Sequence, residues 1–174
     1  MNLIFPRRIR RIVIQDLDKS KVKSFFKSKV IVSNKVVEVA RGLVGTPYCF
    51  QQRSRTLGCD CLGLILLIGW ELKLFGFDIK GYGKTVGNQL KDGIEKHCQR
   101  LPGIREGALV LFEIDSVPQH CGIITNYRDD WGLVHAYENV GQVREHSLIN
   151  WWKDKIVAVY GLPNVNYQQK TFDF

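Results

Sequence analysis

The stretch Gly58-Cys59-Asp60-Cys61-Leu62-Gly63-Leu64 opens the longest apolar run of the chain, which continues to Phe75. From Cys61 to Trp70 no residue carries a charge, and the apolar side chains recur at nearly every position rather than on one face. A helix with this pattern has to be buried on most sides. Asp60 is a residue type that caps helix N-termini, so the sequence predicts a buried helix that starts at Cys61.

A second helix is predicted upstream, over residues 35–45, where apolar side chains recur with helical spacing. Ser33 or Asn34 is expected to cap its start, and Gly45-Thr46-Pro47 is expected to end it. Residues 48–58 are rich in Gln, Arg and Ser, and they are expected to form a loop between the two helices.

Downstream the pattern changes from helical to strand-like. Residues 76–105 are polar and contain several glycines, with a helix expected near 88–98. Strands are predicted over 107–114, 119–127, 133–138, 142–145 and 155–162, with turns at 115–118 and 129–132. Helices first and strands afterwards predict an α+β fold, in which N-terminal helices pack on a mostly antiparallel sheet and the buried helix carries Cys61.

Length and composition fit one globular domain with an arm. The 174 residues are 45% hydrophobic and 24% charged, which excludes a wholly disordered chain, a collagen-like fibre and a coiled-coil rod. The sequence contains no uncharged apolar run of the roughly 18 residues that a membrane span needs. Residues 1–14 hold arginines but no long apolar core and no small-residue cleavage site, so no secretory signal is expected.

The formal net charge of +8 is concentrated at the N-terminus. Of the 25 basic and 17 acidic residues, 10 and 2 lie within 1–35, which leaves 15 of each for the rest. Such an arm can bind nucleic acid, an anionic wall polymer or a lipid surface, or it can be a solvated extension. It shows little interleaving of aromatic with basic residues, so nucleic acid is not the partner we expect first. The predicted division is a basic extension over 1–34, a domain over 35–163 and a C-terminal tail over 164–174.

Five cysteines, an odd number, argue against a disulfide framework. The chain has no C-x-x-C pair, and a metal cluster of Cys59, Cys61, His120 and Cys121 does not have the usual ligand spacing. Cys49, Cys98 and Cys121 are therefore interpreted as small buried hydrophobic residues.

A cysteine at a helix start and two histidines on consecutive strands point to chemistry. The thiolate is the nucleophile, and a helix N-terminus favours it through its dipole and its free N–H groups, which also stabilise an oxyanion. Cys61 has this position, and a neighbouring imidazole would serve as base and acid. Taken singly, a histidine in a strand is more often structural, and a cysteine in an apolar helix usually only packs.

The strand pattern leaves the relative position of His120 and His135 open. With a turn at 128–132, residues whose numbers sum to about 260 face each other. His120 then lies opposite residue 140 and His135 opposite residue 125, unless a bulge or another turn changes the register. The remaining histidines, His97 and His146, have polar and charged neighbours and are expected to face solvent.

These residues together resemble the NlpC/P60 cysteine peptidases. The signature of that family is a helix, G-T-P-Y, a short loop and then D-C-x-G-L, which Gly45-Thr-Pro-Tyr48 and Asp60-Cys-Leu-Gly-Leu64 match. Gln119-His-Cys-Gly122 and Leu133-Val-His-Ala136 resemble its two histidine strands. The resemblance covers about residues 35–162.

Further details resemble the branch of that family found in phages and gene-transfer agents. They are Gln51-Gln52 before the cysteine and an ending with Gly141-x-Val143 and Trp151-Trp152. Two departures concern the substrate groove: Leu62 stands where many members have Ser, and Phe50-Gln51-Gln52 stands where they tend to have Trp-Gly-Gly. The bond that is cleaved therefore stays open.

The resemblance implies a papain-like NlpC/P60 fold and a cysteine endopeptidase. Cys61 would be the nucleophile, His120 the general base and acid, and His135 the residue that orients His120. Tyr48 would help the oxyanion site, and Asp60 would help to hold the amine of the substrate. The implied bond joins γ-D-glutamate to a diamino acid in peptidoglycan stem peptides, and no metal or organic cofactor is implied.

Three functions fit these observations. The first is a cell wall peptidase that is made in the cytoplasm, joins phage-like tail proteins in a particle and acts at the wall. The second is a tail component that binds glycan or protein through a disused cleft. The third is a papain-like amidase or acyltransferase that acts on another amide or ester, because the same residues serve any acyl transfer.

Overall fold

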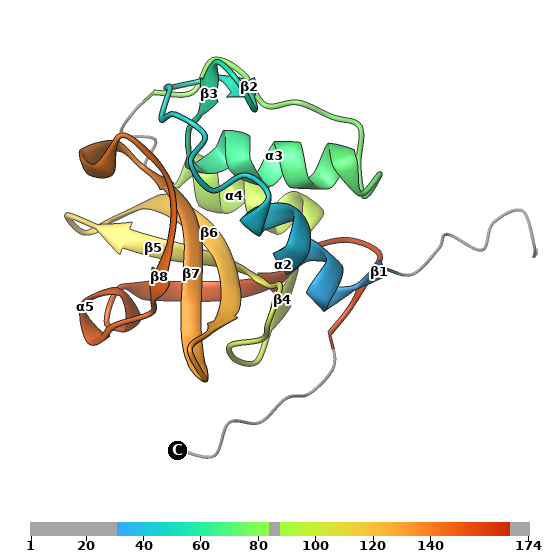
Figure 1. Ribbon diagram of the computed structural model, residues 1–174, viewed down its shortest axis with the longest axis vertical. Coiled ribbons are helices and arrows are strands. Elements are labelled where there is room, and N and C mark those ends of the chain that lie inside the picture. Colours follow the sequence, from blue (N-terminus) through green and yellow to red (C-terminus); the bar gives the residue numbers. More distant parts are fainter. Residues whose placement is uncertain (1–30, 84–87, 168–174) are drawn as a thin grey trace, which may run out of the picture.

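The computed structural model describes residues 31–83 and 88–167, in which short helices pack on one large sheet (Figure 1). In chain order the elements are β1 (Ile31–Val32), α2 (Ser33–Arg41), β2 (Arg53–Ser54), β3 (Gly58–Cys59), α3 (Cys61–Glu71), α4 (Gln89–His97), β4 (Gln99–Leu101), β5 (Leu109–Ile114), β6 (Val117–Tyr127), β7 (Asp130–Tyr137), η1 (Glu138–Val140), β8 (Gln142–Ser147), α5 (Asn150–Lys153), β9 (Ile156–Gly161) and β10 (Val165–Asn166). The predicted α+β fold class is confirmed. The basic extension and the C-terminal tail lie mostly outside the described residues, and the domain limits 35–163 stay a prediction.

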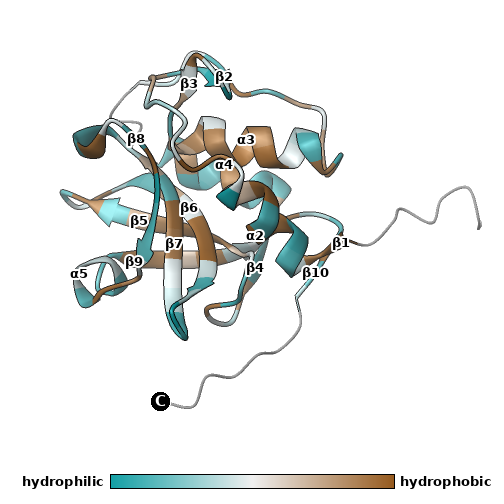
Figure 2. Ribbon diagram, in the orientation of Figure 1, coloured by the Kyte–Doolittle hydropathy of each residue, from teal (hydrophilic) through white to brown (hydrophobic). Residues whose placement is uncertain are grey.

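Helix α3 begins at Cys61, as the sequence predicts. Asp60 precedes it in extended conformation, and its Oδ1 accepts a hydrogen bond of 2.7 Å from the Gly63 N–H. Leu64 and Ile68 are fully buried, and Figure 2 shows the helix as hydrophobic along most of its length. The apolar run therefore forms the centre of the core, and the cap fixes where the helix starts.

The third residue of this helix, Gly63, lies where there is no room for a side chain. A Cβ atom there would lie 2.3 Å from the carbonyl oxygen of Gln52, far inside van der Waals contact. The loop before β2 thus passes directly over the first turn of α3. The spacing Asp-Cys-x-Gly combines a cap, a first-turn cysteine and the space that this loop needs.

Helix α2 differs from its prediction at both ends. Its N-cap is Val32, which has no capping side chain, because Ile31 and Val32 pair with β10 and enter the helix directly from a strand. The helix ends at Arg41 rather than at residue 45. The residues after it leave the helix because they bind to β8. There the Gly45 N–H donates to the Val143 carbonyl oxygen at 2.9 Å.

The main sheet has the strand order β4-β9-β5-β6-β7-β8, and all its neighbours are antiparallel. One face packs against α2, α3 and α4 through residues such as Leu109, Leu111 and Ile123. The other face holds a second apolar cluster around Phe112 and Trp152. The loop predicted over 48–58 instead contains the short antiparallel hairpin β2–β3, whereas the helix expected near 88–98 is confirmed as α4.

The register of β6 and β7 differs from the expected one by about three residues. Arg128 and Asp129, both with positive φ, make a tight two-residue turn, so Tyr127 pairs with Asp130. The strands continue into residues that the sequence pattern assigned to the turn. The numbers of paired residues therefore sum to 257 rather than 260. This register brings His135 closer to the level of His120 than the sequence predicted.

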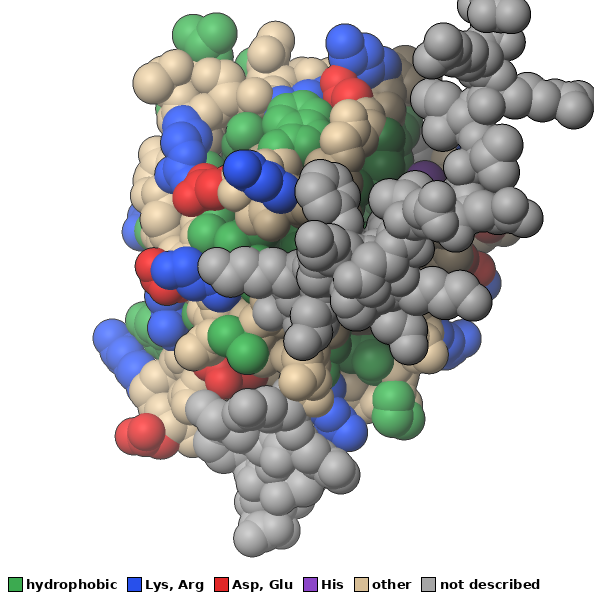
Figure 3. Space-filling view, turned by 90° about the vertical axis from the view of Figure 1, so that its right-hand side faces the viewer, with side chains coloured by type: hydrophobic (Ala, Val, Ile, Leu, Met, Phe, Trp, Pro, Cys, Tyr) green, Lys and Arg blue, Asp and Glu red, His purple; other side chains and the backbone are tan. Residues whose placement is uncertain are grey.

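The visible surface in Figure 3 carries basic and acidic side chains interspersed, with small groups of apolar side chains between them. None of the helices in 31–83 and 88–167 is long and apolar enough to cross a membrane.

Candidate active site

Cys61 is the first residue of α3, and its sulfur meets two groups from β6. The His120 imidazole and the Cys121 thiol both form hydrogen bonds with it, and the Cys121 backbone N–H forms another. The thiol of Cys121 donates, so the negative charge resides on Cys61. These contacts place a cysteine sulfur beside an imidazole at a helix N-terminus, as the sequence predicts.

The environment favours the thiolate form of Cys61. The hydrogen bond from the Cys121 thiol, followed by the contact with His120, holds the pKa of Cys61 well below its ordinary value in spite of burial. The same hydrogen bond, together with burial, raises the pKa of Cys121 well above its ordinary value. The prediction that Cys121 is only a packing residue therefore missed its contact with Cys61.

His120 and His135 are in direct contact. Nε2 of His120 lies 2.8 Å from Nδ1 of His135, and the two side chains are 8% and 1% exposed. Burial, and then the neighbouring imidazoles, lower the pKa of His135 to about 2. His135 is therefore a neutral ring across the physiological pH range, and the Nδ1 of His120 is left for Cys61.

His146 joins this pair, which contradicts the prediction that it faces solvent. Its Nε2 lies 2.9 Å from Nε2 of His135, and its Nδ1 lies 2.8 Å from the Ser147 carbonyl oxygen. The pattern assigned a strand only to 142–145, whereas β8 continues to Ser147. In the structure, His146 pairs with Leu133 and lies beside His135. The sequence prediction missed this contact because it ended the strand two residues too early.

Aromatic side chains hold the imidazoles in place. Tyr137 stacks on His135 with ring centroids 5.3 Å apart, and Trp152 meets His135 edge-on at 4.8 Å. Trp152 also packs against Phe112, which lies beside His120. His97, the other histidine expected in solvent, is partly buried and stacks on Phe77 at 4.0 Å, away from this chain of rings.

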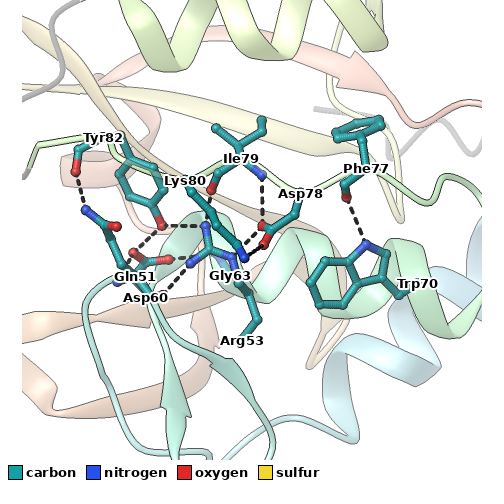
Figure 4. Close-up of polar contacts among 10 residues, drawn as sticks. All are labelled: Gln51, Arg53, Asp60, Gly63, Trp70, Phe77, Asp78, Ile79, Lys80 and Tyr82. Carbon is teal, nitrogen blue, oxygen red and sulfur yellow. Dashed lines mark hydrogen bonds and ion pairs between the residues drawn. The ribbon is translucent and has the colours of Figure 1, made fainter.

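Asp60 organises the loop that faces Cys61. Besides capping α3, its carboxylate accepts 2.8 Å and 2.6 Å hydrogen bonds from the Gln51 N–H and the Tyr82 hydroxyl (Figure 4). Asp60 is 2% exposed, and burial raises its pKa above the ordinary value. Tyr82 is a site residue that the sequence did not reveal, because nothing in its spacing links it to Asp60.

Arg53 ties the segment 75–83 to the same loop. Its guanidinium pairs with Asp78 at 2.7 Å and donates to the backbone carbonyls of Gln51 and Ile79 (Figure 4). At the residue before Asp78, the Trp70 indole N–H donates to the Phe77 carbonyl oxygen at 2.9 Å. The segment is thus held against α3 along most of its length.

Tyr48 lies beside Cys59, and its backbone N–H donates to the Gly141 carbonyl oxygen at 2.8 Å. Burial, with the nearby Glu138, raises the pKa of its hydroxyl above the ordinary value. The hydroxyl therefore stays protonated and able to donate a hydrogen bond at neutral pH.

A cavity of about 550 Å³ connects these residues. Its polar lining includes Tyr48, Asp60, Cys61 and His120, which were all predicted as site residues. His135 is not among its lining residues. Among the described residues no group of three or more His, Cys, Asp or Glu side chains is arranged to hold a metal ion.

Another part of the cavity is lined by apolar side chains. It runs between α3, α4 and the segment 75–83, and it is lined by side chains that include Leu62, Ile65, Leu66, Phe77, Leu90 and Ile94. The cavity therefore joins the polar groups around Cys61 to an apolar space.

Comparisons with known proteins give structural neighbours only. No family model matches the sequence. No curated protein matches it either. The structure is similar to an NLP/P60 family lipoprotein-like protein from Staphylococcus aureus, at TM-score 0.53 and 17% identity over 75% of this chain. It spans 41% of that protein.

This chain covers nearly the whole of two further neighbours. The NlpC/p60 domain of the peptidoglycan hydrolase SagA gives a TM-score of 0.51 at 19% identity. The match covers 75% of this chain and 98% of the SagA domain. An N-acetylmuramoyl-L-alanine amidase from Bacteroides uniformis gives 0.52 at 12% identity, covering 79% and 99%. At these identities the likeness establishes the architecture. The chain has the papain-like α+β fold of NlpC/P60 proteins.

Proposed function

We propose that this protein is a cysteine hydrolase of the bacterial cell wall, with Cys61 as nucleophile and His120 as general base and acid. The observation that carries the proposal is the contact between His120 and a Cys61 whose thiolate is favoured at the N-terminus of α3. His135, in contact with His120, is the proposed orienting residue. The neighbours named as a peptidoglycan hydrolase and an amidase support a wall substrate.

The proposed reaction is acyl transfer in two steps. The Cys61 thiolate attacks an amide carbonyl, and the Tyr48 hydroxyl with N–H groups at the start of α3 stabilises the oxyanion. His120 then gives a proton from Nδ1 to the leaving amine, which breaks the C–N bond and leaves a thioester. Water, deprotonated by His120, attacks the thioester and releases the acid and the Cys61 thiol.

Asp60 is proposed to act on the amine side of the substrate. A carboxylate offers about four acceptor positions, and the Gly63 N–H, the Gln51 N–H and the Tyr82 hydroxyl occupy three of them. The remaining position can accept from a substrate ammonium group at the cavity. The bond that we propose joins γ-D-glutamate to a diamino acid in stem peptides, and the proposed setting is a phage tail or particle.

The test is mass spectrometry of purified muropeptides incubated with the full chain, with Cys61→Ala and with Cys49→Ala as a matched control. We expect new stem-peptide fragments from the wild type and from Cys49→Ala, and none from Cys61→Ala. The masses of the fragments identify the bond. Fragments that persist with Cys61→Ala would rule out Cys61 as the nucleophile.

Absence of fragments from the wild type leads to a second assay, alkylation of Cys61 near neutral pH. An unreactive Cys61 would contradict the hydrolase and favour a binding role in a tail. The apolar cavity behind Cys61 favours one further candidate, an amidase or acyltransferase for substrates with an aliphatic group. Turnover of long-chain but not short-chain p-nitrophenyl esters would support that candidate over the peptidase.

A further inference from the structure

Three imidazoles from three neighbouring strands form a continuous hydrogen-bonded chain. His120 on β6 contacts His135 on β7 at 2.8 Å, and His135 contacts His146 on β8 at 2.9 Å. The chain ends at the Ser147 carbonyl oxygen, 2.8 Å from Nδ1 of His146. Its other end is the Nδ1 of His120, which serves Cys61.

The direction of these hydrogen bonds follows from the last partner. A carbonyl oxygen only accepts, so Nδ1 of His146 must donate to Ser147. A neutral imidazole has one donor and one acceptor, so Nε2 of His146 accepts from the Nε2–H of His135. Nδ1 of His135 then accepts from the Nε2–H of His120.

This direction of the hydrogen bonds is compatible with Cys61 both as a thiol and as a thiolate. With neutral His120, a lone pair on Nδ1 faces the thiol of Cys61 and can take its proton. After that transfer His120 carries both N–H groups, and its Nε2–H still donates to His135. The reverse direction would put a proton on Nδ1 of a neutral His120, which could then not act as a base.

The surroundings hold His135 and His146 in these roles. His135 is 1% exposed, its pKa is low, and it is enclosed by Tyr137 and Trp152, so it stays neutral and keeps one acceptor. The nearest carboxylate along β8, Glu145, forms hydrogen bonds of 2.9–3.0 Å with the guanidinium of Arg41. Glu145 is therefore engaged elsewhere.

We propose that His146 is a positioning residue, which takes its orientation from the Ser147 carbonyl and sets the tautomers of His135 and His120. This role rests on the proposed function, because it concerns the base that serves Cys61. His146 is not among the residues that line the cavity, and its hydrogen bond to the site runs through His135.

The first test compares two substitutions of similar length. His146→Gln keeps a strong acceptor for the Nε2–H of His135, whereas His146→Met offers only a weakly accepting thioether sulfur. We expect His146→Gln to stay within about threefold of wild-type kcat and His146→Met to lose about tenfold or more, because a wrong tautomer disables the base. KM should be unchanged in both. Arg144→Met, an exposed change on the same strand, is the control and should match the wild type.

Equal losses in His146→Gln and His146→Met, or full activity in both, would overturn the role. Thermal unfolding of each variant separates this outcome from loss of the fold. A loss of kcat confined to His146→Met, at an unfolding temperature equal to that of His146→Gln, supports the role.

The second test does not need turnover. Nitrogen-15 NMR of the full chain with Cys61→Ala reads the protonated nitrogen of each ring, with His97 as a reference outside the chain of rings. We expect Nε2–H in His120 and His135 and Nδ1–H in His146. Nδ1–H in His120 or His135 would refute the direction even if the hydrolase activity is real. The expected pattern would stand if the activity were absent.

Discussion

A second thiol lies against Cys61. Cys121 follows His120 on β6, and its side chain and backbone N–H both form hydrogen bonds with Cys61. A thiol is a weak donor, but in a buried site it is in direct contact with the developing charge. Cys61 thus owes its low pKa to His120 and Cys121 of β6.

Replacing Cys121 by Val keeps the apolar volume and removes the S–H donor. The pKa of Cys61 should then rise, and once it lies above the assay pH of about 6.5, each further pKa unit slows alkylation by iodoacetamide about tenfold. The sign follows because a lower pKa leaves more thiolate at a given acidic pH. We expect the wild-type rate to reach half its maximum well below the ordinary cysteine pKa of about 8.5.

The measurement is the alkylation rate of the Cys61 peptide as a function of pH, read by mass spectrometry. Cys49→Ala is the control and should show the wild-type midpoint. A midpoint that is the same in the wild type and in Cys121→Val would assign the low pKa to His120 and the backbone N–H of residue 121 alone.

At the scale of the elements, the close approach of β6 and β7, which places His120 beside His135, depends on Gly122. A Cβ atom on Gly122 would lie 2.7 Å from the Val134 carbonyl oxygen and 3.0 Å from the His135 Cβ. The two strands can approach this closely only because position 122 has no side chain. In the Gln-His-Cys-Gly sequence, the packing of the two strands therefore requires a glycine two residues after His120.

Gly122→Ala should push β6 away from β7 and lower the free energy of unfolding by about 1–3 kcal/mol. Gly76→Ala is the control, because a Cβ atom there meets nothing within 4 Å and φ is not positive. Urea denaturation monitored by circular dichroism measures both. Equal midpoints for the two variants would show that the strands adapt to the extra carbon at little cost.

These elements also show what the sequence can predict. The start of α3 followed from Asp60 and the apolar run, because a cap and a buried helix are local features. The register of β7 did not follow, because Arg128 and Asp129 adopt left-handed backbone without the glycine that usually marks such a turn. His146 was missed for a related reason: its contact with His135 depends on that register and on two further residues of β8.

Cavity shape and the contacts of Tyr82 lay beyond sequence reasoning as well. Tyr82 and Asp60 are 22 residues apart and belong to a loop and a helix cap, so no periodicity connects them. The family resemblance indicated Cys61, His120 and His135 as a set, and the structure brings these three together. Their roles stay a prediction until the variants are measured.

At the scale of the molecule, the two ends of the described fold close on each other. Ile31 pairs with Val165 in a parallel ladder, and the Ile31 N–H donates to the Asn164 carbonyl oxygen at 2.9 Å. Next to this pair, the hydroxyl of Tyr167 accepts a 2.7 Å hydrogen bond from the Leu162 N–H. Leu162 is 3% exposed, so its N–H has little access to water.

Tyr167→Phe removes this acceptor and leaves the Leu162 N–H without its partner. The free energy of unfolding should fall by about 1–3 kcal/mol, the usual cost of an unsatisfied buried donor. Chemical denaturation of the full chain measures the change, with Asn166→Ala, at an exposed neighbouring position, as the control. A variant as stable as that control would mean that another group satisfies the N–H.

The β1–β10 pair has a consequence for engineering. Ile31 and Val165 are ladder partners, and neighbouring strands are about 5 Å apart, so the folded unit could be grafted into a surface loop of a host protein with short joints on either side. Linking these two points would equally allow circular permutation, with new termini opened in the hairpin turn at Asp115 and Ser116. A folded unit with adjacent ends can be moved between carrier proteins with short linkers.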